Sequence, residues 1–473
     1  MDPDQIKEYV NRHVDQGVIP TLVEFVRIPS LSPDYDPNWE TNGLLLEAMN
    51  LMIKYVDSLS IKGFTHEVLK EPGKPWLFYG TLPATDPSLP TVLMYGHFDK
   101  QPHMEGWSEG LGPATPVIRG DRLYGRGCSD DGYAIPTSAV IMKALQEFSI
   151  PHGKIILIGE NEEESDSSSL VYYVNLLKPR MGQIDIVVCL DSGILTYDQL
   201  WVTTSLRGIM NLDLTVKTLK AGVHSGGGSG IIPSTFRILE ILLSRIEDKD
   251  TGRILVPELH TNIDPQVYID KASTIKVIND SFLKLIPFED GVKPVSNDLT
   301  QMYLDNTYVP TLVVTGVEGL PSLQNAGNVL QPQITLRLSI RVPPGVDSKV
   351  ALEAVKRELV RDPPYNAKVS VSETSPDNGW AQKPNKEWLD DALNQASLKF
   401  FGNEALKLGE GGTIPFIGFL GESFPSSQFI ITGLLGTDSN AHSVDENLDI
   451  PYLKKLTCCM IDAFGTLGKR GSN

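Results

Sequence analysis

The sequence is poor in cysteine and in positive charge. Its four cysteines, Cys128, Cys189, Cys458 and Cys459, form no CxxC pair and are too few for a disulfide framework in 473 residues. We therefore expect a reducing, cytoplasmic location. Lysine and arginine number 41 against 59 aspartates and glutamates, which gives a net charge of −18. A negative field of this size repels phosphate backbones and anionic lipid, so neither nucleic acid nor a membrane surface is an expected partner.

Long apolar runs are also absent. No stretch approaches the ~20 apolar residues that cross a bilayer. The first five residues are acidic and lack the basic and apolar regions of a secretory signal. A hydrophobic content of 41% with 21% charged residues is instead ordinary for a globular chain. At roughly 150 residues per domain, the length predicts more than one core.

Apolar strands alternate with amphipathic helices along the first 200 residues or so. Two helices, at 6–27 with a possible break at Pro20 and at 41–60, come first. Strands are then predicted at 91–95, 154–159 and 184–190, with helices between them at 133–148 and 168–177. This alternation predicts an α/β domain with a mainly parallel mixed sheet flanked by helices.

The pattern changes at Arg207. Elements follow in the order β-α-β-β-α-β, which is that of a ferredoxin-like α+β module, at 209–216, 234–246, 311–317, 333–341, 348–361 and 367–373. A largely helical insertion at about 250–308 interrupts this order. A helix at 386–401 and a strand at 428–431 then indicate a return to the first domain. We therefore predict one domain formed by 1–206 and 385–473, and a second, inserted domain at 207–384.

Histidine is scarce, with eight in the chain, and one of them stands in a chemically suggestive position. Gly96-His97-Phe98-Asp99 directly follows a predicted strand, at the carboxyl end where open α/β sheets bind ligands. Side chains alternate along extended backbone, so His97 and Asp99 point the same way. This suits an imidazole metal ligand that is oriented by a carboxylate. The alternative is a loop histidine beside a solvated aspartate.

Two further clusters are acidic. Asp130 and Asp131 lie between glycines just before a predicted helix, where Asp130 could cap the helix or a carboxylate could bridge two cations. Glu163 and Glu164 belong to a run of acids after a strand. Such a run is either a solvated loop or a place where one carboxylate binds a cation while its neighbour carries protons.

Asp191 and His442 complete the candidates. Asp191 ends the strand at 184–190, and His442 lies near the carboxyl terminus. With the three clusters above they form the set His, Asp, Glu, Asp, His. If these side chains converge at one edge of the sheet, they provide ligands for two zinc-like ions.

Eight ordered motifs resemble the M20 family of dinuclear metallopeptidases, and within it the cytosolic non-specific dipeptidase and carnosinase branch. They are GHFDKQP (96–102), GRGCSDDG (125–132), ENEEES (160–165), Asp191, SLRG (205–208), VHSG (223–226), EGGTIP (410–415) and AHSVDEN (441–447). The resemblance covers nearly the whole chain. It implies a zinc-peptidase-like catalytic domain with an inserted ferredoxin-like domain that acts as a lid and forms a homodimer.

The resemblance also implies a role for each matching residue. The metal ligands are His97, Asp130, Glu164, Asp191 and His442, with Asp130 bridging two divalent ions. Asp99 orients His97, Glu163 is the general base, and the peptide bond between Asp130 and Asp131 is cis. Zinc is the expected ion, and manganese is the alternative that the oxygen-rich part of the set allows.

Four further positions are implied to contact substrate or the neighbouring subunit. His224 reaches the active site of the neighbouring subunit to polarise the scissile carbonyl, and Arg341 holds the substrate carboxylate. Asn328, Gly412 and Thr413 contact the bound substrate. The plainer interpretations are a turn histidine at 224 and a surface arginine in an ion pair at 341.

The implied activity is hydrolysis of dipeptides or short peptides with a free C-terminal carboxylate, by a water held between the two ions and deprotonated by Glu163. Hydrolysis of N-acyl amino acids would use the same metals and the same hold on the carboxylate. A catalytically silent dimeric binding protein is a third possibility, against which the complete ligand set argues. Two departures from the family bear on substrate choice: Asp166 replaces a glycine, and residues 376–380 lack a histidine.

Overall fold

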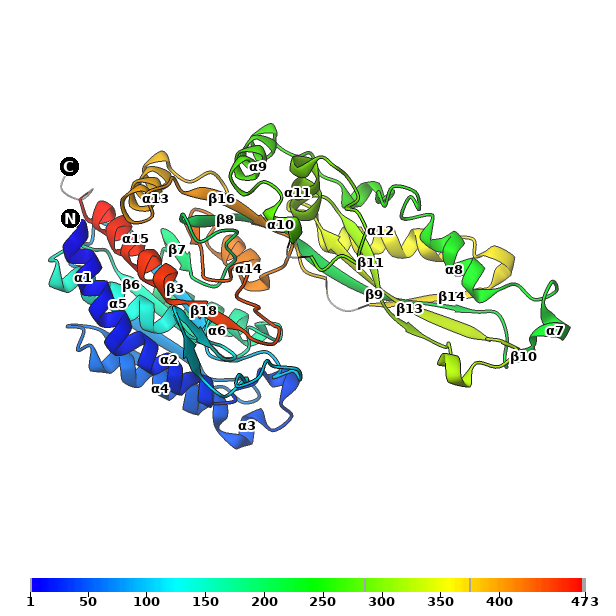
Figure 1. Cartoon of the computed structure of the whole chain (residues 1–473), viewed down its shortest axis with the longest axis horizontal. Coiled ribbons are helices and arrows are strands. Elements are labelled where there is room, and N and C mark those ends of the chain that lie inside the picture. The colour runs from blue at the N-terminus through cyan, green and yellow to red at the C-terminus, as the bar shows by residue number, and fades with distance from the viewer. Residues whose placement is uncertain (1, 285, 374–375, 470–473) are drawn as a thin grey trace.

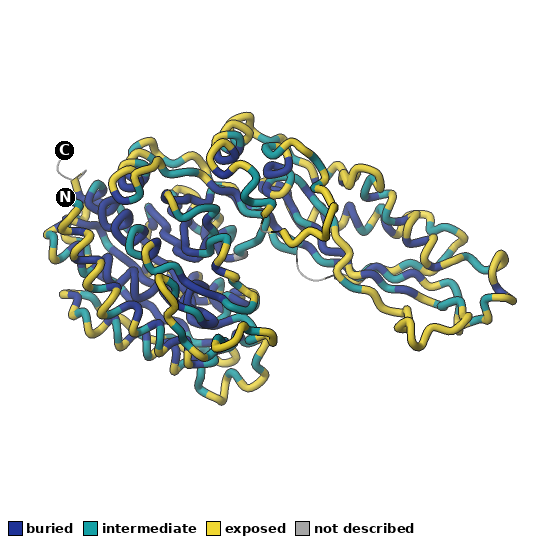
Figure 2. The backbone as a smooth tube through the Cα atoms, in the orientation of Figure 1, coloured by how far each residue is buried: buried dark blue, intermediate teal, exposed yellow. Residues whose placement is uncertain are grey.

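Two lobes of different construction make up the chain, as Figure 1 shows for the computed structural model. The structure describes residues 2–284, 286–373 and 376–469. In these residues, no helix is both long and apolar enough to cross a membrane. Figure 2 shows that the inner strands of the first lobe are deeply buried, whereas much of the second lobe is half-buried or exposed.

A six-stranded mixed sheet forms the centre of the first lobe, in the order β1-β2-β6-β3-β7-β17. Its strands are β1 (Thr65–Leu69), β2 (Leu77–Leu82), β3 (Val92–His97), β6 (Ile155–Glu160), β7 (Ile186–Cys189) and β17 (Gln428–Ile431). The last four of these are parallel to one another, β2 is antiparallel to β6, and β1 is antiparallel to β2. Strands β3, β6 and β7 are buried at every position, as expected for apolar strands covered on both faces. The predicted mixed α/β fold is confirmed.

Helices cover both faces of this sheet. One face, which includes Met94, shares a hydrophobic core with α1 (Pro3–His13), α2 (Ile19–Arg27), α4 (Leu44–Ser58), α5 (Ala134–Glu147), α13 (Glu387–Phe400) and α15 (Ile450–Gly468). The opposite face, which includes Leu93, packs against α6 (Ser168–Met181) and α14 (Pro415–Ser423). Neighbouring residues of β3 thus enter different cores because side chains alternate along a strand.

The predicted break at Pro20 does not occur, because the backbone stays helical from α1 into α2. The irregularity is a π-helical turn at Val14–Val18, which ends just before Pro20. The predicted helix at 41–60 is divided at Gly43, between α3 (Trp39–Asn42) and α4. Gly43 has a φ of +77°, a left-handed conformation that favours glycine.

Two three-stranded sheets complete the first lobe. One has the order β15-β8-β16, from Trp380–Ala381, Trp201–Leu206 and Leu406–Glu410. The other has the order β18-β5-β4, from Asn447–Asp449, Arg122–Tyr124 and Val117–Arg119. Because β18 pairs with β5, the carboxyl-terminal segment lies beside the chain that leads to Asp130.

A four-stranded antiparallel sheet, in the order β11-β13-β9-β14, forms the second lobe. Its strands are β11 (Thr311–Glu318), β13 (Gln333–Val342), β9 (Gly208–Lys217) and β14 (Lys368–Glu373). Helices α8 (Thr235–Leu243) and α12 (Ser348–Val360) pack on one face. The β-α-β-β-α-β order is the predicted one. At the end away from the first lobe lie β10 (Val223–His224), α7 (Ser225–Gly228) and β12 (Val329–Leu330).

The insertion contains α9 (Pro265–Ile278), α10 (Ser281–Lys284) and α11 (Leu299–Tyr308). Helices α9 and α11 contact β16. Ile275, Ile278 and Tyr303 join the hydrophobic core of the first lobe and not that of the four-stranded sheet. The insertion therefore rests on the first lobe, although its sequence lies within the segment that we assigned to the second domain.

Candidate metal centre

Three parallel strands bring polar side chains to one edge of the central sheet. Strands β3 and β6 pair in register, so that His97 lies opposite Glu160, and Tyr95 of β3 lies opposite Cys189 of β7. The chain beyond β6 carries Glu163 and Glu164, and the chain beyond β7 carries Asp191. The strand predicted to end at Tyr95 thus extends to His97, which the sheet itself holds in place.

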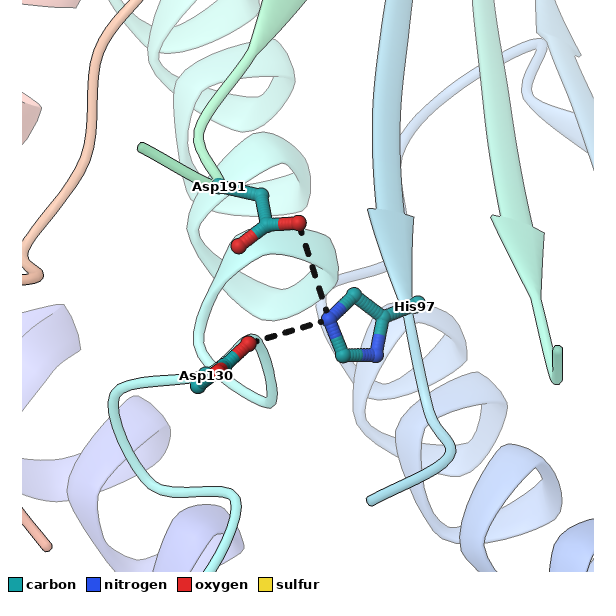
Figure 3. Close-up of side chains that lie close together, drawn as sticks. All are labelled: His97, Asp130 and Asp191. Carbon is teal, nitrogen blue, oxygen red and sulfur yellow. Dashed lines mark hydrogen bonds and ion pairs between the residues drawn. The ribbon is translucent and has the colours of Figure 1, made fainter. Parts of the chain in front are cut away.

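Asp130 stands at the centre of two groups of metal-ligating side chains. The Nε2 atom of His97 lies 3.2 Å from Oδ1 of Asp130 and 3.7 Å from Oδ2 of Asp191. Figure 3 shows these three side chains converging on the imidazole from three separate segments. The Nε2 atom of His442 lies 2.9 Å from Oδ2 of Asp130 and 3.2 Å from Oε2 of Glu164. The two Asp130 oxygens therefore face different histidines.

Both groups have the spacing of a cation site. In each of the sets His97-Asp130-Asp191 and Asp130-Glu164-His442, one ligand atom per residue lies within 4.8 Å of the others. The structure thus brings together the five predicted ligands. Four of them are buried, and His442 keeps 56% of its side-chain surface exposed. The peptide bond between Asp130 and Asp131 is cis, as predicted.

The negative charges of the clustered carboxylates favour the binding of cations. Burial raises the pKa of Glu163, and the charge of Asp191 raises it further. Burial also raises the pKa of Asp191, to about 7. Burial alone would lower the pKa of His442, but hydrogen bonds to Asp130 and Glu164 raise it to about 11. Carboxylates buried this close together either take up protons or need added positive charge to stay ionised. The imidazole and carboxylate donors fit two borderline divalent ions.

Asp99 does more than the sequence predicted. Its carbonyl oxygen lies 3.1 Å, and its Oδ1 3.5 Å, from Nδ1 of His97. Its carboxylate also accepts hydrogen bonds from the backbone amides of Glu163, at 3.2 Å, and Glu164, at 2.9 Å. One buried aspartate thus fixes a candidate ligand on β3 and the acidic loop after β6. This second contact depends on two loops meeting in space, and no sequence motif signals it.

Glu163 lies beside the ligands without joining either group. Its Oε2 is 4.0 Å from Nε2 of His97, and the side chain is 13% exposed. It belongs to neither three-residue set. A carboxylate of raised pKa next to a cation site is suited to accept and return a proton.

Three of the predicted substrate contacts lie where the lobes meet. The Nη1 atom of Arg341, near the end of β13, donates to Oγ1 of Thr413 at 3.1 Å. Thr413 in turn donates to the carbonyl of Arg207, the residue between β8 and β9, at 2.6 Å. Gly412 precedes Thr413 and is half-buried. A side chain added at Gly412 would meet no atom within 4 Å, so its surroundings are open.

His224 and Asn328 lie elsewhere. His224 is in β10, and its Nδ1 accepts a hydrogen bond from the Gly226 amide at 3.1 Å. The carbonyl of Asn328 accepts from the Ser225 amide at 2.8 Å. Figure 1 places this segment at the far end of the second lobe from β3 and β7. Within a single chain, these two residues are not brought to the candidate metal centre.

Sequence reasoning assigned no role to two glutamates beside the site, the half-buried Glu410 and the buried Glu446. Oε1 of Glu410, in the EGGTIP motif, accepts hydrogen bonds from Oγ of Ser192, at 2.5 Å, and the Gly193 amide, at 2.9 Å, directly after Asp191. Glu446, in the AHSVDEN motif, forms a buried ion pair with Arg126 at 2.7 Å. Both glutamates lie within motifs that resemble the M20 family, and this position could have marked them as candidates.

A match to a protein-family model shows which family the chain belongs to. The model of peptidase family M20/M25/M40 matches residues 93–464. The chain belongs to this family. The resemblance found in the sequence is confirmed, and the M20/M25/M40 match identifies an enzyme with peptidase-type hydrolase activity.

Known proteins of similar length share the fold over nearly the whole chain. Cys-Gly metallodipeptidase dug1 of Schizosaccharomyces pombe is 26% identical over 98% of both sequences. Beta-Ala-His dipeptidase of Homo sapiens is 26% identical over 94% of this chain and 89% of that protein. The crystal structure of human carnosine dipeptidase 1 superposes with a TM-score of 0.77 at 23% identity, over 99% of both chains. The dipeptidase activities in these names are those of the similar proteins.

Proposed function

We propose that this M20-family chain is a metal-dependent dipeptidase. It cleaves the peptide bond of dipeptides or short peptides that carry a free C-terminal carboxylate. The observation that supports this most directly is the pair of ligand sets that share Asp130, with Glu163 beside them. The family match and the dipeptidase activities named for two relatives support the same reaction class.

The proposed mechanism gives separate tasks to neighbouring side chains. His97, Asp130, Glu164, Asp191 and His442 would hold two divalent ions, zinc by expectation and manganese as the alternative. When bound, the ions supply an acidified water and polarise the scissile carbonyl. Glu163 takes the proton from the attacking water and returns it to the leaving amine. Asp99 keeps the imidazole of His97 and the acidic loop in position.

Arg341 supplies substrate selection in this proposal. Its guanidinium is half-buried and reaches the Gly412-Thr413 loop. Burial lowers the pKa of Arg341, yet arginine stays charged in the physiological range. A fixed planar cation at this place suits a substrate carboxylate.

We further propose that the second lobe is a lid through which two chains form a homodimer. Strand β11 is an edge strand of the four-stranded sheet and exposes Val313 by 57%, Val314 by 49% and Val317 by 55%. An exposed edge with apolar side chains favours pairing with another chain. In such a dimer, His224 and Asn328 would complete the substrate site of the neighbouring subunit. A cytoplasmic location remains our expectation, and the four cysteines, all free thiols, are consistent with a reducing compartment.

A substrate panel tests the proposed reaction. The purified chain is freed of metal, reloaded with zinc or manganese and analysed for bound metal. It is then assayed with dipeptides beside N-acetyl amino acids. We expect about two ions per chain and hydrolysis of dipeptides. Cleavage of N-acetyl amino acids alone would favour the amidohydrolase function, and no hydrolysis by the metal-loaded enzyme would contradict both.

A further inference from the structure

Glu446 joins two segments that carry candidate metal ligands. It follows His442 by four positions and directly precedes β18, which pairs with β5. Its carbonyl accepts a hydrogen bond from the Gly125 amide at 2.9 Å, at the start of the segment that leads to Asp130. The Glu446 side chain is fully buried at 0% exposure.

The Glu446 carboxylate accepts hydrogen bonds from that same segment. Its Oε2 accepts from Nη1 of Arg126 at 2.7 Å. Its Oε1 accepts from the Gly127 amide at 2.9 Å, the Ser129 amide at 3.3 Å and Oγ of Ser129 at 3.2 Å. The next residue is Asp130, which belongs to both ligand sets. The backbone before Asp130 is therefore tied to the segment of His442.

Arg126 extends this connection to a third loop. It is 1% exposed, and its Nη2 donates to the carbonyl of Pro102 at 3.0 Å, in the chain beyond His97. A buried ion pair gains little net stability, because both charges lose their hydration. Such a pair, with hydrogen bonds to three loops, contributes chiefly to geometry.

We propose that Glu446 is a positioning residue of the metal centre. Through Arg126 and the amides of Gly127 and Ser129, it sets where the Asp130 carboxylate stands relative to His442. Glu446 belongs to neither ligand set, so it acts through other residues. The inference rests on the proposed function in one respect, namely that Asp130 and His442 hold cations.

The test compares cation affinity between variants of the full-length chain. Glu446→Gln keeps the size of the side chain and an acceptor oxygen, but it leaves the buried Arg126 charge unbalanced. We expect zinc and manganese affinity, titrated on metal-free protein against a chelating dye, to fall about 10- to 100-fold. The visible spectrum of the cobalt-substituted protein should change as well, because the ligand geometry shifts. Arg126→Lys, a milder second variant, should change both in the same direction.

Asp462→Asn is the matched control. Asp462 is also buried and accepts hydrogen bonds at 2.7 and 2.6 Å from Nζ of Lys399, within the same lobe. This variant breaks an ion pair between α13 and α15 in which Asp462 is buried and Lys399 is partly exposed, and it should leave cation affinity and the cobalt spectrum unchanged. Unchanged affinity and spectrum in Glu446→Gln, or an equal loss in Asp462→Asn, would overturn the proposal.

The proposed function fails in a different way. A wild-type chain that binds two cations but cleaves no dipeptide would contradict the dipeptidase activity and leave the effect of Glu446→Gln intact. A wild-type chain that binds no cation would overturn both proposals.

Discussion

Glu163 and Glu164 are neighbours in sequence that have different surroundings. Oε2 of Glu164 lies 3.2 Å from His442 and belongs to a ligand set, whereas Glu163 belongs to none. Asp99 holds the amides of both residues and so fixes the direction in which each side chain leaves the loop. A ligand and a proton carrier can thus be adjacent because one buried aspartate fixes the backbone between them.

At this residue scale, Glu163→Gln should separate metal binding from catalysis. The amide keeps the shape but accepts no proton at neutral pH, so we expect turnover to fall about 10²- to 10⁴-fold with unchanged metal content. Metal analysis and steady-state kinetics on dipeptides measure the two properties. Glu162→Gln is the control, because the Glu162 carboxylate accepts a hydrogen bond from the Ser169 amide at 2.7 Å, a contact that glutamine can retain. Near-normal turnover in Glu163→Gln would remove the proposed base.

At the scale of elements, helix α9 docks on the first lobe with a buried lysine. Lys271 is 3% exposed, and its Nζ lies 5.0 Å from the ring centroid of Tyr303 and 5.7 Å from that of Tyr308. Its Nζ occupies the space that a side chain at Gly409 of β16 would need. Burial lowers the pKa of Lys271 to about 7, against the opposing effects of Asp270 and Glu410.

This buried lysine predicts a pH-dependent stability. Between pH 7 and ~10.5, the unfolded chain holds a proton on Lys271 that the folded chain has released, so Lys271 makes stability rise with pH in this window. Lys271→Met removes that dependence and fills similar volume. Its gain in urea stability over wild type should therefore be larger at pH 7 than at pH 9.5. The exposed Lys276→Met, on the same helix, should show no such difference. Equal gains for Lys271→Met at both pH values would contradict the prediction.

The elements also show how far the sequence can be interpreted. Strands β3, β6 and β7 are apolar runs followed by polar clusters, so their order and the convergence of their ends follow from local pattern. The position of α9 against the first lobe does not follow from local pattern. The spacing of Ile275 and Ile278 indicates a buried helix face but not which lobe covers it. The contacts of Glu446 with the segment before Asp130 escape prediction for the same reason, since they join residues distant in sequence.

At the scale of the whole molecule, the separation of His224 from the candidate metal centre makes subunit complementation decisive (Figure 1). We predict that Glu163→Gln and His224→Ala chains, each impaired alone, regain activity when co-expressed with different tags and purified as a mixed dimer. One of the two sites in that dimer has both native residues, so activity should reach about half of wild type. A mixed dimer no more active than its parents would show that His224 does not act across subunits.

The positions of Asp130 and His442 along the polypeptide have a consequence for biosynthesis. His97, Asp130 and Asp191 are all translated before the ribosome reaches the second lobe, whereas His442 is translated after it. A nascent chain can therefore assemble one ligand set early and complete the other only after the second lobe has been synthesised. A premature stop codon shortly before His442 would yield a protein able to form one cation site and unable to form its partner.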